Sequence, residues 1–201
     1  MLSIDSVKIR RGCTMLIQGP SGSGKTTLLG LITGVLSPIE GRLHVLGQDL
    51  TALGPAQKDA FRRDEMGVIF QMFNLLPFLT VTDNILLPLR LSSKRRQKLS
   101  PLTMAQEAHR LLDALGLSRD IRDRPAHQLS VGQQQRVAAA RALIGNPSLV
   151  IADEPTSALD EQNQDDFLSL LIEQVRATQA TLIMVSHDSR LTGRFDGVLK
   201  L

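Results

Sequence analysis

The sequence predicts an α/β protein in which an all-helical subdomain interrupts a core built on a mostly parallel sheet. Short apolar runs at 14–18, 149–153 and 181–186 are typical of strands buried on both faces of a parallel sheet. The stretch from about Met72 to Leu143 has a helical pattern instead. We therefore assign residues 1–71 and 145–201 to the α/β core and residues 72–144 to the helical subdomain.

The individual elements follow from apolar periodicity and from the residues that punctuate it. We expect strands at Thr14–Gln18, Leu43–Leu46, Gly67–Phe70, Leu149–Asp153, Thr181–Ser186 and, at one edge, Gly197–Leu201. We expect helices at Lys25–Gly34, Ala105–Leu115, Val131–Ile144 and Gln162–Ala177. The charge run formed by Lys94, Arg95, Arg96 and Lys98 is interpreted as a solvated loop, with contact to lipid headgroups or a partner as the alternative.

The composition is that of a globular protein, with 42% hydrophobic and 21% charged residues among 201. The net charge of only +3 does not call for a nucleic-acid partner, and we expect none. The single Cys13 excludes an internal disulfide and fits a reducing compartment. No apolar run is long enough to span a membrane and no secretory signal is present. We therefore expect a cytoplasmic chain that reaches the inner (plasma) membrane only through a partner.

A phosphate-binding loop follows the first strand. The pattern G-x-x-x-x-G-K-S/T is matched at every position by Gly19, Pro20, Ser21, Gly22, Ser23, Gly24, Lys25 and Thr26. Glycines allow backbone N–H groups to turn inward around an anion, and the helix that follows directs its positive end at the same point. Lys25 would contact the β- and γ-phosphates, and the hydroxyl of Thr26 can ligate Mg²⁺. The loop predicts a P-loop NTPase.

A pair of acidic residues ends the apolar run at 149–153. Because a carboxylate at the end of a buried strand is costly unless it is paired or bound to a metal, Asp153 is expected to hold Mg²⁺ through water. Glu154 follows directly and is placed to polarise the attacking water as a general base.

Four further short sequence segments narrow the class of P-loop NTPase. Gln71 ends the strand that begins at Gly67, residues 129–133 read LSVGQ, residues 157–160 read SALD, and His187 follows the strand at 181–186. Each segment is weak alone, but their order and spacing are informative. On these residues and the two phosphate motifs, the chain resembles the nucleotide-binding subunit of an ABC transporter over residues 3–199. Within that family, residues 70–89 resemble the group of lipoprotein-release and macrolide-export ATPases, and also the cell-division relative.

The resemblance implies an ATPase that uses ATP and Mg²⁺. Its catalytic residues would be Glu154, His187, Lys25 and Gln71, and its metal would be held by Thr26, Gln71 and Asp153. ATP would lie on the loop residues 19–26 together with Thr27. The family also implies that two copies pair head to tail around two ATPs, so that the partner copy completes each site with Ser130, Gly132, Gln133 and Asp160. A separate transmembrane permease subunit would be driven by this pair.

The pairing also has a physical basis. Ser130 and Gly132 stand at the start of the predicted helix at 131–144, and a helix N-terminus with a small hydroxyl residue is an anion site. A second such site in a chain that already has a phosphate loop is explained if it serves the nucleotide of another copy.

Two departures from the family pattern have consequences. Val131 stands where the family has Gly, and a β-branched residue is tolerable there only if the position needs a helical φ, which we favour. No aromatic residue precedes Phe61, so an adenine-stacking contact is missing. Since base stacking on an aromatic side chain is worth about 1–3 kcal/mol, we expect weak ATP binding with poor discrimination between bases.

Other interpretations stay open at this point. The apolar segment Phe73–Leu79, with Leu76 and Phe78, is expected either to dock on the membrane partner beside Gln71 or to pack within the helical subdomain. The chain could instead be a soluble ABC ATPase that acts on DNA or ribosomes, although it lacks the insertions such proteins carry. It could also be a non-catalytic ABC switch, which the intact Lys25 and Glu154 argue against.

Overall fold

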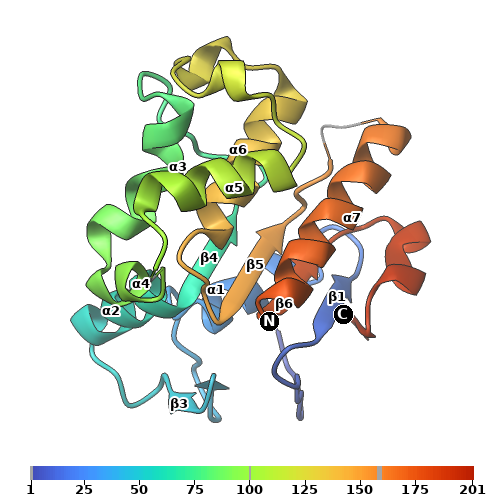
Figure 1. Ribbon diagram of the computed structural model, residues 1–201. Coiled ribbons are helices and arrows are strands. Elements are labelled where there is room, and N and C mark those ends of the chain that lie inside the picture. The colour runs from blue at the N-terminus through green and yellow to red at the C-terminus, as the bar shows by residue number, and fades with distance from the viewer. Residues whose placement is uncertain (1, 100, 158–159) are drawn as a thin grey trace.

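The computed structural model describes residues 2–99, 101–157 and 160–201, and its centre is a five-stranded sheet (Figure 1). The strand order is β4-β5-β6-β1-β7, and every neighbouring pair is parallel. The strands are β1 (Thr14–Gln18), β4 (Met66–Ile69), β5 (Leu149–Asp153), β6 (Thr181–Val185) and β7 (Gly197–Lys200). A separate antiparallel hairpin pairs β2 (His44–Val45) with β3 (Gln48–Asp49). The predicted α/β class with a mostly parallel sheet is confirmed.

The helices differ more from the predictions than the strands do. The core carries α1 (Lys25–Ile32), α2 (Pro55–Glu65), α7 (Glu161–Ala177) and the 3-10 helix η3 (Ser189–Arg194). Between β4 and β5 the chain forms α3 (Val81–Leu91), α4 (Ser93–Gln97), α5 (Met104–Ala114), η1 (Arg119–Ile121), η2 (Ala126–Gln128) and α6 (Val131–Leu143). The predicted helices at 105–115, 131–144 and 162–177 are confirmed within a residue or two at each end. The helices α3 and α4 lie in the stretch predicted to be helical but were not predicted individually, and α2 was not predicted.

Both faces of the sheet are buried because successive residues of a strand point to opposite sides. Leu16, Val150 and Leu182 face a hydrophobic core that includes residues of α3, α5, α6 and α7. Ile17, Ile151 and Ile183 face a second core with α1 and the β2–β3 hairpin. This arrangement explains why the strands have continuous apolar sequences, and it fixes the direction in which each strand ends.

The charge run at 94–98 is the clearest disagreement with the sequence interpretation. It forms α4 rather than a loop, and Arg95 is buried with only 2% of its surface exposed. The Arg95 guanidinium donates hydrogen bonds to the carbonyl oxygens of Met66 (3.2 Å), Ala142 (2.9 Å) and Ile144. The interpretation of this residue as solvated is therefore wrong, because backbone carbonyls at the start of β4 and the end of α6 bind its charge.

Among the residues that the structure describes, no helix combines the length and the apolar composition that crossing a membrane requires.

Candidate nucleotide site

The candidate site lies where the parallel strands end. The register pairs Ile17 with Val185, Asp153 with Val185, and Ile69 with Ala152, so β1, β4, β5 and β6 end side by side. In a parallel sheet, the loops that follow these carboxyl ends share one edge, which is where such folds bind ligands. The loops carry the phosphate motif, Gln71, the acidic pair and His187.

The phosphate loop has the shape of an anion cradle. Gly22 and Gly24 have φ values of 83° and 98°, which L side chains rarely adopt. A Cβ at Gly19 would stand 2.5 Å from Ser23 Oγ, so the loop closes tightly there. Gly24 is the N-cap of α1 without a side-chain cap, and the first turn of α1 has no acidic residue. The first N–H groups of α1 and its positive end are thus directed at the inside of the loop.

Two polar groups of this loop fit a phosphate. Ser23 Oγ is buried and has no hydrogen-bond partner among the described residues. The Lys25 ammonium is buried at the mouth of the loop, where it donates to the carbonyl oxygens of Gly19 and Pro20, each at 2.8 Å. A cation held by neutral carbonyls gains when it binds a phosphate oxygen instead. The loop residues present therefore fit the triphosphate that the motif predicts.

The acidic pair lies next to this loop. Asp153 ends β5 and is half-buried, and burial together with the neighbouring Glu154 charge raises the pKa of its carboxyl, while Lys25 lowers it. Thr26 is exposed at the start of α1. A hydroxyl and one carboxylate suit Mg²⁺, which keeps several waters and takes its other ligands from phosphate oxygens. The residues Thr26 and Asp153 therefore fit the implied metal.

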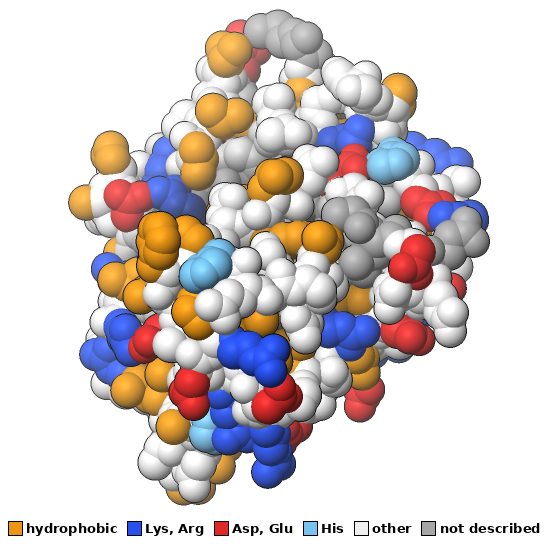
Figure 2. Space-filling model, turned by 90° about the horizontal axis from the view of Figure 1, so that it is seen from above, with side chains coloured by type: hydrophobic (Ala, Val, Ile, Leu, Met, Phe, Trp, Pro, Cys, Tyr) orange, Lys and Arg blue, Asp and Glu red, His pale blue; other side chains and the backbone are white. Residues whose placement is uncertain are grey.

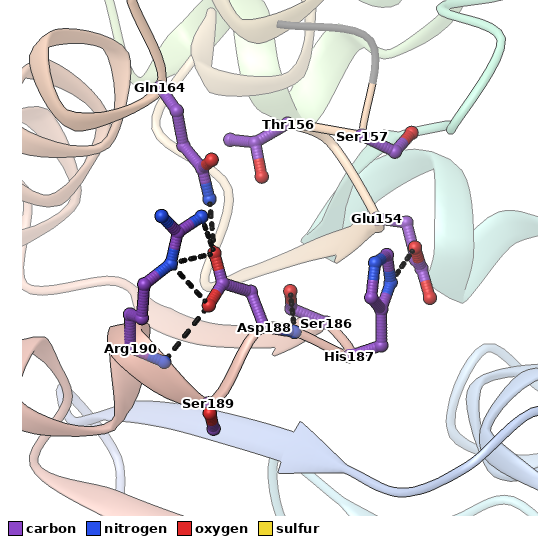
Figure 3. Close-up of a pocket in the computed structure, with 9 residues that line it drawn as sticks. All are labelled: Glu154, Thr156, Ser157, Gln164, Ser186, His187, Asp188, Ser189 and Arg190. Carbon is purple, nitrogen blue, oxygen red and sulfur yellow. Dashed lines mark hydrogen bonds and ion pairs between the residues drawn. The ribbon is translucent and has the colours of Figure 1, made fainter. Parts of the chain in front are cut away.

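Glu154 and His187 form a direct contact. Glu154 has a φ of 44°, and its N–H donates to the Val185 carbonyl at 3.0 Å, which turns its side chain toward the loop after β6. The His187 Nδ1 lies 2.7 Å from Glu154 Oε2 (Figure 3). The imidazole is 68% exposed, whereas the carboxylate is only 19% exposed. The structure thus brings together two predicted catalytic residues that are far apart in the sequence.

Gln71 lies in a turn rather than at the end of a strand. The strand β4 ends at Ile69, and Phe73 and Asn74 have φ values of 60° and 48° that break an extended chain. The prediction that Gln71 ends a strand is wrong by two residues, and its side chain is exposed. Beside it, Phe73 is buried, whereas 80% of Met72 and 87% of Phe78 are exposed. One part of the apolar segment Phe73–Leu79 therefore packs inside the helical subdomain, and another part faces outward.

The LSVGQ segment begins α6. The Ser130 side chain caps the helix by accepting from the Gln133 N–H, and the Gln133 side chain accepts from the Ser130 N–H. Gly132 is in the first turn, and Val131 is helical with no positive φ. The substitution Gly to Val is thus compatible with the backbone here. No hydrogen bond joins Ser130 to the phosphate loop of the same chain within the described ranges.

Asp160 caps α7, where its carboxylate accepts from the Asn163 N–H at 3.0 Å. Ala158 and Leu159, the middle of the SALD segment, lie outside the described residues. Thr27 is exposed in the first turn of α1, and Ser21 is exposed in the phosphate loop.

Sequence reasoning missed three residues behind this site. Gln18 and Gln164 each donate a hydrogen bond to Asp188, the residue after His187. The polar Gln18 at the end of an apolar strand was a weak signal for such a role. Nothing in the sequence connects it to positions so distant along the chain.

The family profile described as "ABC transporter" matches residues 2–157. The chain is 37% identical over 196 residues to the lipoprotein-releasing system ATP-binding protein LolD of Xanthomonas oryzae pv. oryzae, covering 97% of this chain and 78% of that protein. It is 37% identical over 196 residues to the macrolide export ATP-binding/permease protein MacB of Rhodopirellula baltica, covering 98% of this chain and 28% of that protein.

Among solved structures, the fold is similar to the dimeric, post-hydrolysis state of the ATP-binding cassette MJ0796 bound to ADP and Pi. The TM-score is 0.85 at 35% sequence identity, and the match covers 97% of this chain and 83% of that chain.

Proposed function

The chain belongs to the ABC transporter family as an ATP-hydrolysing, ATP-binding subunit, and on that premise we propose how its own residues act. The predicted group, with lipoprotein-release and macrolide-export ATPases, is likewise confirmed. We further propose that residues 1–71 and 145–201 bind the nucleotide. Residues 72–144, which include the LSVGQ segment, would contact the second copy and the membrane partner.

The first step is the binding of ATP to the loop at residues 19–26. Lys25 exchanges its two carbonyl partners for oxygens of the β- and γ-phosphates, and the N–H groups at the start of α1 bind the same anion. Thr26, Gln71 and Asp153 would hold Mg²⁺, which neutralises charge on the phosphate oxygens when it is bound. Because Asp153 is half-buried, its ionised carboxylate is unfavourable without a counter-charge, and binding of a cation would stabilise it.

The second step is the attack of water on the γ-phosphorus. Glu154 accepts a hydrogen bond from the water and takes its proton as the new P–O bond forms and the bond to the β–γ bridging oxygen breaks. The contact of 2.7 Å with His187 holds the Glu154 carboxylate in one orientation. His187 and Lys25 stabilise the negative charge that develops on the transferred group.

The third step is pairing. The exposed Ser130 at the start of α6 presents helix N–H groups outward, and we propose that they bind the γ-phosphate of an ATP held by a second copy. Gly132, Gln133 and Asp160 would complete this half of the site. Closure of two chains around two ATPs would then act on the membrane partner.

A transmembrane permease subunit is the proposed partner, and it would place the chain at the inner (plasma) membrane on the cytoplasmic side. The exposed side chains of Met72, Leu76 and Phe78, beside Gln71, supply an apolar surface for it. Figure 2, which views the molecule from above Figure 1, shows hydrophobic side chains set among charged ones on the face it draws. No nucleic-acid partner is proposed, since the net charge is only +3.

The observation that carries this proposal is the Glu154–His187 contact beside the phosphate loop. We expect Lys25→Ala to lose ATP binding and Glu154→Gln to bind ATP but stall before hydrolysis. The matched control is Glu173→Gln, the same change at an exposed position of α7, which should hydrolyse ATP as the unchanged protein does. Light scattering should find a dimer of Glu154→Gln only with Mg·ATP. Normal turnover by both Lys25→Ala and Glu154→Gln would overturn the proposed mechanism.

A further inference from the structure

The loop that carries His187 is held on both sides by side chains that the proposed mechanism does not use. A pocket of about 440 Å³ lies at this loop, and Gln164 of α7 lines it together with residues of the loop and of the segment after β5. Figure 3 shows that His187 and Asp188 leave neighbouring positions of the loop in different directions, His187 toward Glu154 and Asp188 toward Gln164 and Arg190. The carboxylate of Asp188 and the imidazole of His187 therefore point away from each other.

The first hold on the loop comes from the strand that leads into the phosphate loop. The buried Gln18 side chain donates from Nε2 to the main-chain carbonyl of Asp188 at 3.0 Å, and to Thr192 Oγ1 at 3.4 Å. Gln18 is also the residue directly before Gly19, the first glycine of the phosphate loop. Gln18 thus joins the start of the phosphate loop to Asp188 through one side chain.

The second hold comes from α7. The buried Gln164 donates from Nε2 to Asp188 Oδ2 at 3.3 Å, and the Gln164 N–H donates to the Asp160 carbonyl at 2.9 Å. Asp160 is the N-cap of α7 and ends the segment that we propose faces the second copy. The start of α7 is therefore joined to Asp188 through one helical turn.

The carboxylate at the centre of this arrangement is firmly fixed. Arg190 binds both of its oxygens, with Nη2 to Oδ2 at 2.7 Å and Nε to Oδ1 at 3.0 Å, and the Arg190 N–H donates to Oδ1 at 2.9 Å. These bonds lower the pKa of Asp188 to about 2, so the group stays ionised at neutral pH. Asp188 is also the N-cap of η3, and its contacts with Gln18 and Gln164 join this cap to β1 and α7.

We propose that Asp188 is a positioning residue for His187. The hydrogen bonds from Gln18 and Gln164 hold Asp188, and Asp188 in turn fixes the position of the imidazole relative to Glu154. This inference rests on the proposed roles of Glu154 and His187 in hydrolysis. It predicts that Asp188 affects turnover only through His187, because Asp188 points away from Glu154 and touches neither the acidic pair nor the phosphate loop by side-chain hydrogen bonds in the described structure.

The test compares steady-state ATP hydrolysis by single and double variants. Asp188→Ala should lower kcat about tenfold with KM for ATP changed less than about twofold, since a small misplacement of a catalytic group costs rate rather than binding. Combined with His187→Ala, Asp188→Ala should lower kcat by less than about twofold further. Asp188→Asn, which keeps an acceptor oxygen for Gln164, should restore part of the rate.

A matched control is available on the same two elements. Asp165 on α7 accepts from Arg194 Nη1 at 2.8 Å at the end of η3, a link between α7 and η3 that does not touch the loop of His187. Asp165→Asn should leave kcat unchanged. If Asp188→Ala does not fold, Gln164→Leu removes one donor to the carboxylate from a helix that remains intact, and it should still lower kcat without changing KM.

The outcomes separate this inference from the proposed function. If His187→Ala is slow but Asp188→Ala and Gln164→Leu equal Asp165→Asn, the positioning role is wrong and the proposed mechanism stands. If Asp188→Ala lowers kcat as strongly in the His187→Ala protein as in the unchanged one, Asp188 does not act through His187 and the inference is overturned. If His187→Ala hydrolyses ATP normally, the proposed role of His187 fails and the inference fails with it.

Discussion

The burial of Arg95 leads to a quantitative prediction of stability. Its guanidinium binds carbonyl oxygens at the start of β4 and the end of α6, and so joins the sheet to the helical part. Replacing it with Met keeps the stem of the side chain and leaves three carbonyl groups without this donor. Each buried group left unpaired costs about 1–3 kcal/mol, so the gross loss is about 3–9 kcal/mol.

Part of that loss is offset because a buried cation is itself costly. Desolvation lowers the pKa of Arg95 to about 10, so the group is still charged at neutral pH but buried unfavourably. Its Nε also has no hydrogen-bond partner in the described part of the chain. Relief of this cost leaves a net destabilisation of about 3 kcal/mol, which in a domain of this size lowers Tm by about 6–12 °C.

The measurement is urea unfolding followed by far-UV circular dichroism, since the chain has no Trp or Tyr to report by fluorescence. Lys94→Met is the matched control on the same helix, because Lys94 is 57% exposed in its pair with Glu65. Glu65, whose side chain is 14% exposed, keeps Ser148 Oγ at 2.7 Å and Lys98 Nζ at 3.9 Å as partners, so this variant should lose about 1 kcal/mol or less. If Arg95→Met lost no more stability than Lys94→Met, the carbonyl contacts would not stabilise the junction as argued.

Three further predictions concern pH, the base and the partner. Asp188→Asn should be less stable than the unchanged protein at pH 7 by about 1 kcal/mol, because a carboxyl whose pKa is lowered on folding stabilises the fold only when it is ionised. The difference in stability should vanish as the pH falls from about 4 toward 2. Urea titrations across this pH range would measure it. ATP should be preferred over GTP by less than about tenfold in equilibrium binding, since no aromatic precedes Phe61, and a hundredfold preference would contradict this. Replacing Leu76 and Phe78 together with Glu should weaken binding to the cognate permease at least about tenfold in a detergent pull-down, without weakening ATP binding. Leu91→Glu, at another exposed apolar position, should leave permease binding unchanged.

Strands and the phosphate loop could be predicted because their signals are local. The sheet is buried on both faces, so its strands are continuous apolar runs, and the loop needs Gly at fixed positions to turn its N–H groups inward. The helix α2 could not be found by periodicity, because none of its residues is buried and it has no apolar stripe. Its local signals were Pro55 at the first turn, after Gly54, and the basic Arg62 and Arg63 in the last turn.

The position of charged and amide groups depended on tertiary contacts that the sequence does not display. A run of Lys and Arg is solvated in most proteins, and only the carbonyls of Ala142 and Ile144, far along the chain, explain why Arg95 is buried. Gln71 was misplaced because an apolar run does not reveal the turn that follows Ile69, which the Phe73 N–H closes by donating to the Phe70 carbonyl at 2.9 Å. The contact of Gln18 with Asp188 joins positions at opposite ends of the chain.

The helical part has its own link to the acidic pair. Gln135 is fully buried in α6, and its Nε2 donates to the carbonyl of Pro155, the residue after Glu154, at 2.5 Å. The helix that starts at Ser130 is thus tied to the turn that carries the proposed base of the same chain. If Ser130 binds the ATP of a second copy, its displacement reaches Glu154 through Gln135, while the chain's own phosphate loop reaches His187 through Gln18. Glu154 is then linked to the second copy's nucleotide through Gln135, whereas His187 is linked to the chain's own nucleotide through Gln18 and to the segment facing the second copy through Gln164. Their contact of 2.7 Å therefore depends on both sites.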